Sequence, residues 1–76
     1  MGNLNWTNVE EKYNDAIVKV ATQNDKDTGV GLDMLISMVC EPDQERRDMA
    51  VSNYGPIPEI DQEAFRADVA EVRKQG

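Results

Sequence analysis

The segment from Asp25 to Asp33 carries the residue types that come nearest to a cation-binding loop. Several carboxylates and two glycines fall close together there. A calcium loop of the EF-hand type needs oxygen ligands at its first, third and fifth positions, a glycine at the sixth and a glutamate at the twelfth. When Gly29 takes the glycine position, Lys26 falls on a ligand position and Leu35 on the glutamate position. We therefore expect a solvated turn between helices, and a metal-binding regulator is only the third of our hypotheses.

The side chains that most often perform catalysis are scarce in this chain. It has no histidine and a single cysteine, Cys40, whereas histidine is the usual general base and the commonest metal ligand. No histidine can activate Cys40, and the neighbouring carboxylate of Glu41 is expected to raise the pKa of the thiol. We expect Cys40 to be a small buried apolar group. The sequence predicts a protein that is not an enzyme, with no catalytic residue, no cofactor and no metal site.

The charge of the chain is strongly negative. Acidic residues outnumber basic residues by 15 to 8, which gives a net charge of −7. This charge disfavours direct binding to nucleic acid or to an anionic membrane. Solubility alone could explain it, and the functional interpretation is an acidic face that docks on a basic protein surface with salt-sensitive affinity. Three acids are the candidate contacts for such a partner: Asp43, Glu45 and Asp48.

No part of the chain has the composition of a membrane or export segment. The longest apolar stretch, Leu32 to Cys40, is interrupted by Asp33 and Ser37, and a membrane span needs about 18 apolar residues. The N-terminus lacks the basic region and the apolar core of a signal peptide. A single thiol fits a reducing compartment. We therefore expect a cytoplasmic protein that makes no contact with a membrane.

Helical periodicity dominates the first half of the chain. Residues 7–23 are predicted to form a helix, because their apolar side chains recur at the spacing of one helical face. Thr7 and Glu10 have the form of a capping box at its start. A second helix is predicted at 32–40, or from Thr28 if that residue caps it. It is apolar around much of its girth, which is typical of a central helix or of one that is half core and half interface. Pro42 ends it, because the residue before a proline is disfavoured in helical conformation.

Two further helices are expected in the second half. Residues 42–53 form a helix with few apolar side chains, and Gly55 stops it. Residues 61–74 form the last helix, capped by Asp61. Because short loops favour antiparallel neighbours, we expect one small all-α domain over residues 1–76, with three to four short helices in a bundle-like antiparallel arrangement. The expected core is Trp6, Tyr13, Ile17, Val20, Leu32, Leu35, Ile36, Val39, Phe65, Val69 and Val72.

Methionines and the single tryptophan allow a second, apolar interpretation of binding. Flexible thioethers are common at adaptable binding surfaces, although filling the core is their more frequent use. Met34 and Met38 lie on the predicted helix 32–40, and we include both among the candidate protein-binding residues. Trp6 either covers the core or anchors a partner.

Size and charge favour a non-enzymatic acidic module that binds another protein through a basic surface of that protein. Their combination suggests a phage or mobile-element accessory protein, an inhibitor that docks on a nucleic-acid-handling host protein. The alternative is a self-associating structural or assembly protein, in which the helix 32–40 lies at a homo-oligomer interface. The two hypotheses differ in their response to salt, because charge-driven docking weakens as salt rises and an apolar interface hardly responds.

Overall fold

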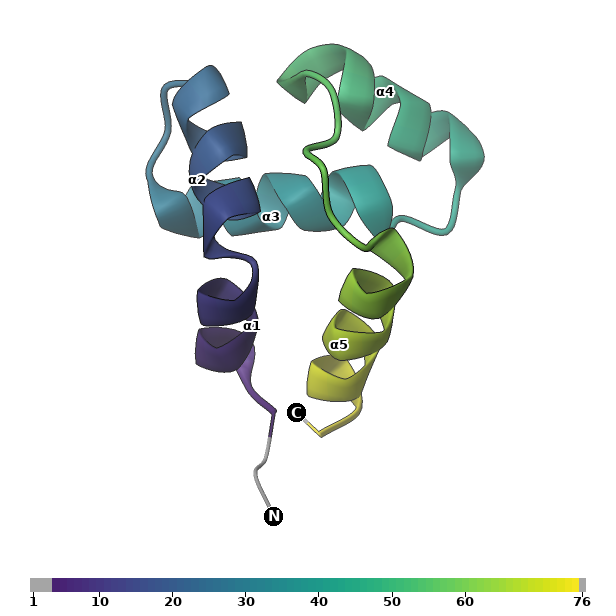
Figure 1. Ribbon diagram of the computed structural model, residues 1–76. Helices are drawn as coiled ribbons and strands as arrows, with labels where there is room; N and C mark the ends of the chain where they lie inside the picture. Colours follow the sequence, from purple (N-terminus) through teal and green to yellow (C-terminus); the bar gives the residue numbers. More distant parts are fainter. Residues whose placement is uncertain (1–3, 76) are drawn as a thin grey trace.

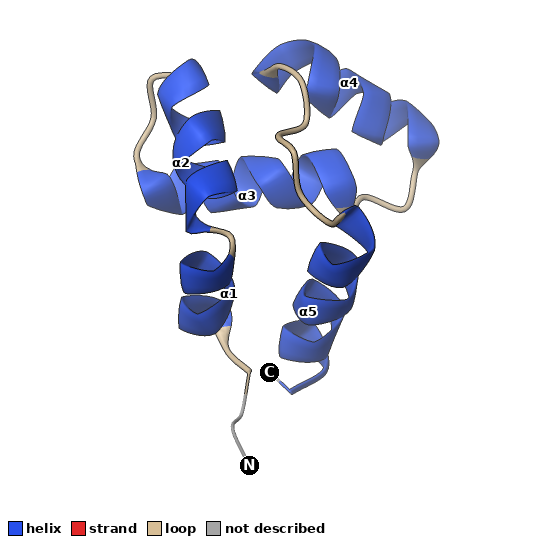
Figure 2. Cartoon of the chain, viewed as in Figure 1, coloured by secondary structure: helices blue, strands red, loops and turns tan. Residues whose placement is uncertain are grey.

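The computed structural model describes residues 4–75, which fold into α-helices with no strand among them. The helices are α1 (Trp6–Lys12), α2 (Asn14–Gln23), α3 (Thr28–Val39), α4 (Gln44–Tyr54) and α5 (Gln62–Gln75). Figures 1 and 2 show α1 and α2 following one another along one side, α3 crossing behind, and α4 and α5 on the other side. The predicted all-α class is confirmed. The predicted number of helices is slightly low, because residues 4–75 form five.

The additional helix arises from a break at Tyr13. Its backbone (φ −112°, ψ 24°) is not helical, so the expected helix 7–23 becomes α1 and α2. The tyrosine ring packs edge-on against Phe65 of α5, with ring centroids 4.8 Å apart, and its hydroxyl donates to Asp68 Oδ2 at 2.6 Å. Apolar periodicity continues across the break, since Val9 and Ile17 are both buried. The spacing of the apolar residues therefore locates the buried face correctly but does not reveal the break in the helix.

The start of α1 lies slightly earlier than the capping box that the sequence suggested. Asn8 N–H donates to Asn5 Oδ1 at 3.0 Å, and Asn5 N–H donates to Asn8 Oδ1 at 2.9 Å. The reciprocal pair is thus Asn5 with Asn8, and the prediction of Thr7 with Glu10 is wrong. The physical reason is that asparagine is among the strongest N-cap residues, and two asparagines can satisfy both backbone donors.

Helix α3 begins at Thr28, the earlier of the two starts that the sequence allowed, but Thr28 is not its cap. Asp27 caps it by accepting a hydrogen bond from Val30 N–H at 3.1 Å. Gly31 consequently lies inside the helix, where it faces α2. A Cβ at Gly31 would lie 2.6 Å from Ile17 O and 2.8 Å from Ala21 Cβ. The absent side chain lets α2 and α3 approach closely at one point. In Figure 1, α3 crosses the direction of α1, α2 and α5, whereas α4 runs back above α3 as an antiparallel neighbour.

The second half of the chain follows the predicted capping more closely. Gly55 ends α4 with a φ of 102°, a conformation that glycine adopts without a steric cost. Asp61 accepts a hydrogen bond from Ala64 N–H at 3.1 Å at the start of α5. Both predicted stop and start signals are therefore confirmed. Helix α4 is as thinly packed as its composition indicated, because Ala50 is its one fully buried residue.

The core forms where α1, α2, α3 and α5 meet, with α4 adding little to it. Trp6 is 39% exposed, so its place in the expected core is wrong, and Ile36 is only partly buried. Met38 is 1% exposed and fills the core. None of the described helices combines the length and the apolar composition needed to span a bilayer. The buried apolar residues are Val9, Tyr13, Ala16, Ile17, Val20, Ala21, Leu32, Met34, Leu35, Met38, Val39, Ala50, Phe65, Val69 and Val72.

Candidate functional site

The three acids singled out from the sequence surround the start of α4, and they differ in what they do there. Asp43 is the N-cap residue of α4, with Oδ1 accepting a hydrogen bond from Glu45 N–H at 3.0 Å. Glu45 is exposed, and Asp48 is exposed with a long hydrogen bond of 3.4 Å from Gln44 Nε2. Asp43 therefore stabilises the helix, whereas the carboxylates of Glu45 and Asp48 are available to a partner.

Most of the carboxylates in this protein have no cationic neighbour. Within residues 4–75, Asp68 is the one acid with a cation inside 4.0 Å, namely Lys12 Nζ at 2.8 Å. Basic side chains have other partners: Arg47 donates to the backbone oxygen of Glu41 at 2.7 Å, and Arg66 donates to the backbone oxygen of Val39 at 3.0 Å. The excess negative charge is therefore presented at the surface without internal neutralisation.

Asp68 belongs to a small polar cluster that fastens the α1–α2 junction to α5. Hydrogen bonds from Lys12 and from Tyr13 lower the pKa of the Asp68 carboxyl. Burial and the bond to Asp68 raise the pKa of the Tyr13 hydroxyl, so it remains a neutral donor. Neither of the two hollows described below is lined by Lys12, Tyr13 or Asp68. We assign it to stability and not to chemistry.

The two candidate methionines lie in the core. Met34 is 8% exposed and Met38 is 1% exposed, whereas Met49 on α4 is 64% exposed. The fold therefore uses Met34 and Met38 to fill the core. A homo-oligomer interface on α3 would have to use its outer face, which carries Asp33, Ile36 and Ser37.

The segment that was compared with a calcium loop forms a turn and a helix start. Asp25 adopts a positive φ of 56°, and Asp27 Oδ1 is engaged by Val30 N–H. Asp33 lies farther on, exposed within α3. In the part of the chain that the structure describes, no three His, Cys, Asp or Glu side chains are grouped as metal ligands.

Cys40 follows α3 and is half-buried. Burial raises the pKa of its thiol, while Arg73 and Arg66 act in the opposite direction. The expected direction of the shift is confirmed, but its expected cause is wrong, because Glu41 is not among the groups responsible. A thiol with a raised pKa is a poor nucleophile at neutral pH.

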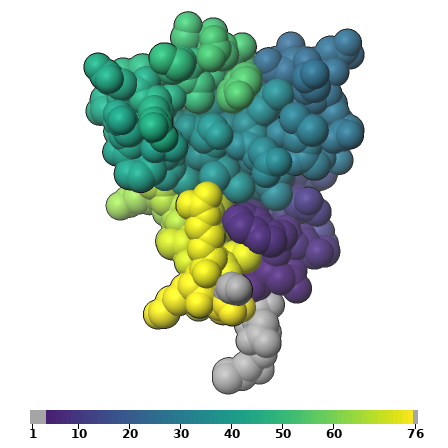
Figure 3. Space-filling model, turned by 180° about the vertical axis from the view of Figure 1, so that it is seen from behind, coloured from purple at the N-terminus to yellow at the C-terminus, as the bar shows by residue number. Residues whose placement is uncertain are grey.

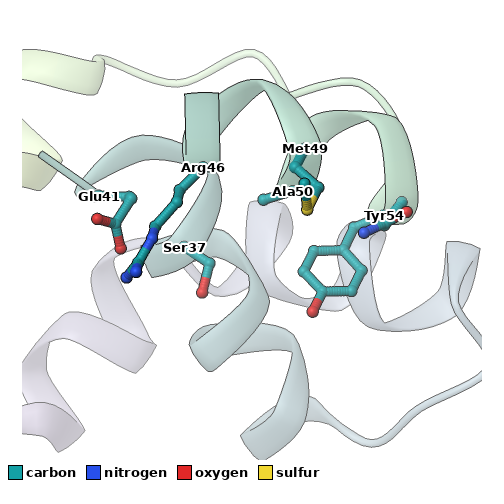
Figure 4. Close-up of a pocket in the computed structure, with 7 residues that line it drawn as sticks. Ser37, Glu41, Arg46, Met49, Ala50 and Tyr54 are labelled. Carbon is teal, nitrogen blue, oxygen red and sulfur yellow. The ribbon is translucent and has the colours of Figure 1, made fainter. Parts of the chain in front are cut away.

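One hollow lies between α3 and α4, and we call it the α3–α4 hollow. Its volume is about 230 Å³. In Figure 4, the side chain of Arg46 extends from α4 toward Ser37 and Glu41, and the ring of Tyr54 lies at the other end. This hollow mixes a cation, a carboxylate and apolar groups. It is lined by Ser37, Glu41, Arg46, Met49, Ala50, Asn53 and Tyr54.

A second hollow lies between α1 and α3, and we call it the α1–α3 hollow. Its volume is about 340 Å³. It has an apolar base, an exposed tryptophan, two carboxylates and no cation among its lining residues. The sequence alone does not bring these residues together, although Trp6 and Glu10 share a face at i,i+4, as do Gly29 and Asp33. The α1–α3 hollow is lined by Trp6, Glu10, Gly29, Leu32, Asp33 and Ile36.

Comparison with known proteins adds no family to this description. No protein-family model, no curated protein and no solved structure matches the chain. The function must therefore be argued from charge and surface geometry.

Proposed function

We propose that this protein is a non-enzymatic acidic module that docks on a basic surface of another protein. The observation that carries the proposal is the state of its acids: the chain has 15 acidic residues, and within residues 4–75 one of them is in an ion pair. Lysine and arginine side chains of a partner can engage such carboxylates without first breaking internal pairs. Their opposite potentials also accelerate encounter.

Among basic protein surfaces, those that bind nucleic acid are rich in clustered lysine and arginine. An acidic module of this size fits the role of an inhibitor that occupies such a site, and a phage or mobile-element accessory protein is one form of it. Glu45 and Asp48 add to the attractive field, and Asp43 serves the helix start. Charge supports this choice of partner.

The test begins with the protein immobilised at low salt to isolate a binding partner, which is then purified and studied alone. Affinity is measured from about 50 to 300 mM salt, with and without a nucleic acid competitor. We expect a basic partner, a steep loss of affinity with salt, and competition by the nucleic acid. An affinity independent of salt would overturn docking by charge. Simultaneous binding of the nucleic acid would overturn the inhibitor role.

Self-association is the second candidate, because apolar side chains remain at the surface. Met49 is 64% exposed, Trp6 is 39% exposed and Ile36 is partly buried. Light scattering at low and moderate salt separates the candidates. A monomer at both salts supports binding to a foreign partner, whereas a salt-insensitive dimer that dissociates with Ile36→Asp or Met49→Asp supports self-association.

A further inference from the structure

We propose that the α1–α3 hollow receives an arginine side chain of the partner protein. This inference rests on the proposed function and specifies the contact at its centre. Figure 3 shows α1 and α3 side by side on the face seen from behind. This hollow combines apolar side chains, an aromatic ring and two carboxylates, and together these groups fit an arginine side chain.

The base of the hollow suits the aliphatic part of a long side chain. Leu32 is 6% exposed and Ile36 is partly buried, so together they offer an apolar surface below the rim. Gly29 contributes no side chain, which leaves that part of the rim open. Long cationic side chains bury their methylene groups against apolar surface while their charged ends remain at polar groups.

Trp6 supplies an aromatic surface at the edge of the hollow. It is the single tryptophan of the chain and is 39% exposed, although its type favours burial. Tryptophan is the best aromatic partner for a cation, and the planar guanidinium of arginine stacks on it. Tryptophan and arginine also dominate the binding energy of protein interfaces.

Glu10 and Asp33 supply negative charge from two different helices. Both side chains are exposed, and within residues 4–75 neither has a cation within 4.0 Å. A guanidinium has five N–H donors in a fixed fork, so an arginine can donate to more than one carboxylate oxygen, which a lysine ammonium does less well. The α3–α4 hollow lacks this complementarity, because Arg46 already lies in it.

The single tryptophan provides the measurement. The protein is titrated with a blocked hexa-arginine peptide and, separately, with blocked hexa-lysine at physiological ionic strength, while the emission of Trp6 is followed. We expect a saturable shift of the emission with both peptides, and tighter binding of hexa-arginine. An emission that hexa-arginine leaves unchanged, or equal affinity for the two peptides, would overturn the proposed arginine site.

A matched pair of variants separates the hollow from general charge attraction. Glu10→Gln/Asp33→Asn and Glu45→Gln/Asp48→Asn each remove two negative charges from exposed positions. Because the Debye length is about 8 Å at physiological salt, we expect the first pair to weaken hexa-arginine binding by about tenfold and the α4 pair by less than about threefold. Circular dichroism checks that both variants keep their helices.

The outcomes of this comparison bear on the two proposals separately. Equal weakening by both pairs would overturn the arginine site and leave docking by a diffuse acidic surface intact. Loss confined to Glu10→Gln/Asp33→Asn, together with weaker calorimetric affinity of Trp6→Ala, supports the arginine site. The proposed function itself is decided by the salt dependence of the purified partner, which does not depend on this peptide.

Discussion

The contact between α2 and α3 and the attachment of α4 represent two ways of holding a helix. At the first, Gly31 brings the backbones of the two helices close together, and α3 buries six residues. At the second, α4 buries one residue, and its end is held by Asn24 Nδ2, which donates to Tyr54 O at 2.9 Å. Close apolar packing fixes the first region, whereas the second depends on this hydrogen bond together with Ala50 and the partly buried Val51 and Tyr54. Regions with few buried apolar contacts are the ones that open most easily.

Two methionines give the widest contrast between the regions. Met38 is 1% exposed in the core and Met49 is 64% exposed on α4. We expect Met38→Ala to lower the free energy of unfolding by about 2–5 kcal/mol through the cavity it leaves, and Met49→Ala to change it by less than about 0.5 kcal/mol. Chemical denaturation measures both. Comparable losses would mean that α4 packs far more firmly than its burial indicates.

The close approach at Gly31 can be tested with a second glycine in the same helix. Gly31→Ala should cost about 2–3 kcal/mol, because the new Cβ meets backbone and cannot be accommodated by a side-chain rotation. Gly29→Ala is the control, since its Cβ would lie 3.6 Å from Asp27 Oδ1, an ordinary contact. We expect that control to stabilise the protein by about 0.5–1 kcal/mol. Equal melting temperatures for the two variants would contradict a close helix crossing.

The polar attachment of α4 is tested at Asn24. Its Nδ2 donates to both Val20 O and Tyr54 O, so Asn24→Ala should cost about 1–2 kcal/mol. Hydrogen exchange of α4 amides should rise more than that of α3 amides. The exposed Asn53, whose side chain makes no hydrogen bond within residues 4–75, is the control. Uniform acceleration across both helices would show that α4 is not separately held.

The smallest expected effect concerns the hydrogen bond from the Tyr13 hydroxyl to Asp68. Tyr13→Phe removes one hydrogen bond and should cost about 1 kcal/mol at neutral pH. Because the folded-state pKa of Asp68 is lowered from 3.8, the stability it contributes is present above that value and is lost as the pH falls through the folded-state pKa. Asp68→Asn should flatten this acid dependence. Thermal melts between about pH 2.5 and pH 6 provide the measurement. If Asp68→Asn leaves the dependence of the melting temperature on pH unchanged, Asp68 does not contribute to it.

The raised pKa of Tyr13 makes stability depend on pH in the opposite direction. Its neutral hydroxyl is favoured in the folded protein, so its contribution is present below the ordinary pKa of 10.0 and is lost as the pH rises through the folded-state value. Tyr13→Phe should therefore be less sensitive to alkali than the parent protein. Tyr13→Phe keeps an aromatic ring beside Phe65, so thermal melts of the two proteins in alkali isolate the contribution of the hydroxyl.

The sequence by itself determined the helical class, the excess of negative charge and several helix ends. These features are local: apolar side chains at helical spacing mark the buried faces, Asp61 can cap the helix that follows it, and Gly55 can adopt the positive φ that ends a helix. Each depends on residues within a few positions of one another, so no knowledge of distant contacts is needed.

Only the tertiary structure decided where the first helix breaks, which methionines are buried and where the α1–α3 hollow forms. Tyr13 is held by Asp68, 55 residues away, and Trp6 of α1 and Ile36 of α3 line the same hollow. Periodicity states which face of a helix is apolar but not which other helix covers it. That choice depends on the close crossing at Gly31, which sets how α3 lies against α2 and leaves Trp6 beside two carboxylates at the surface.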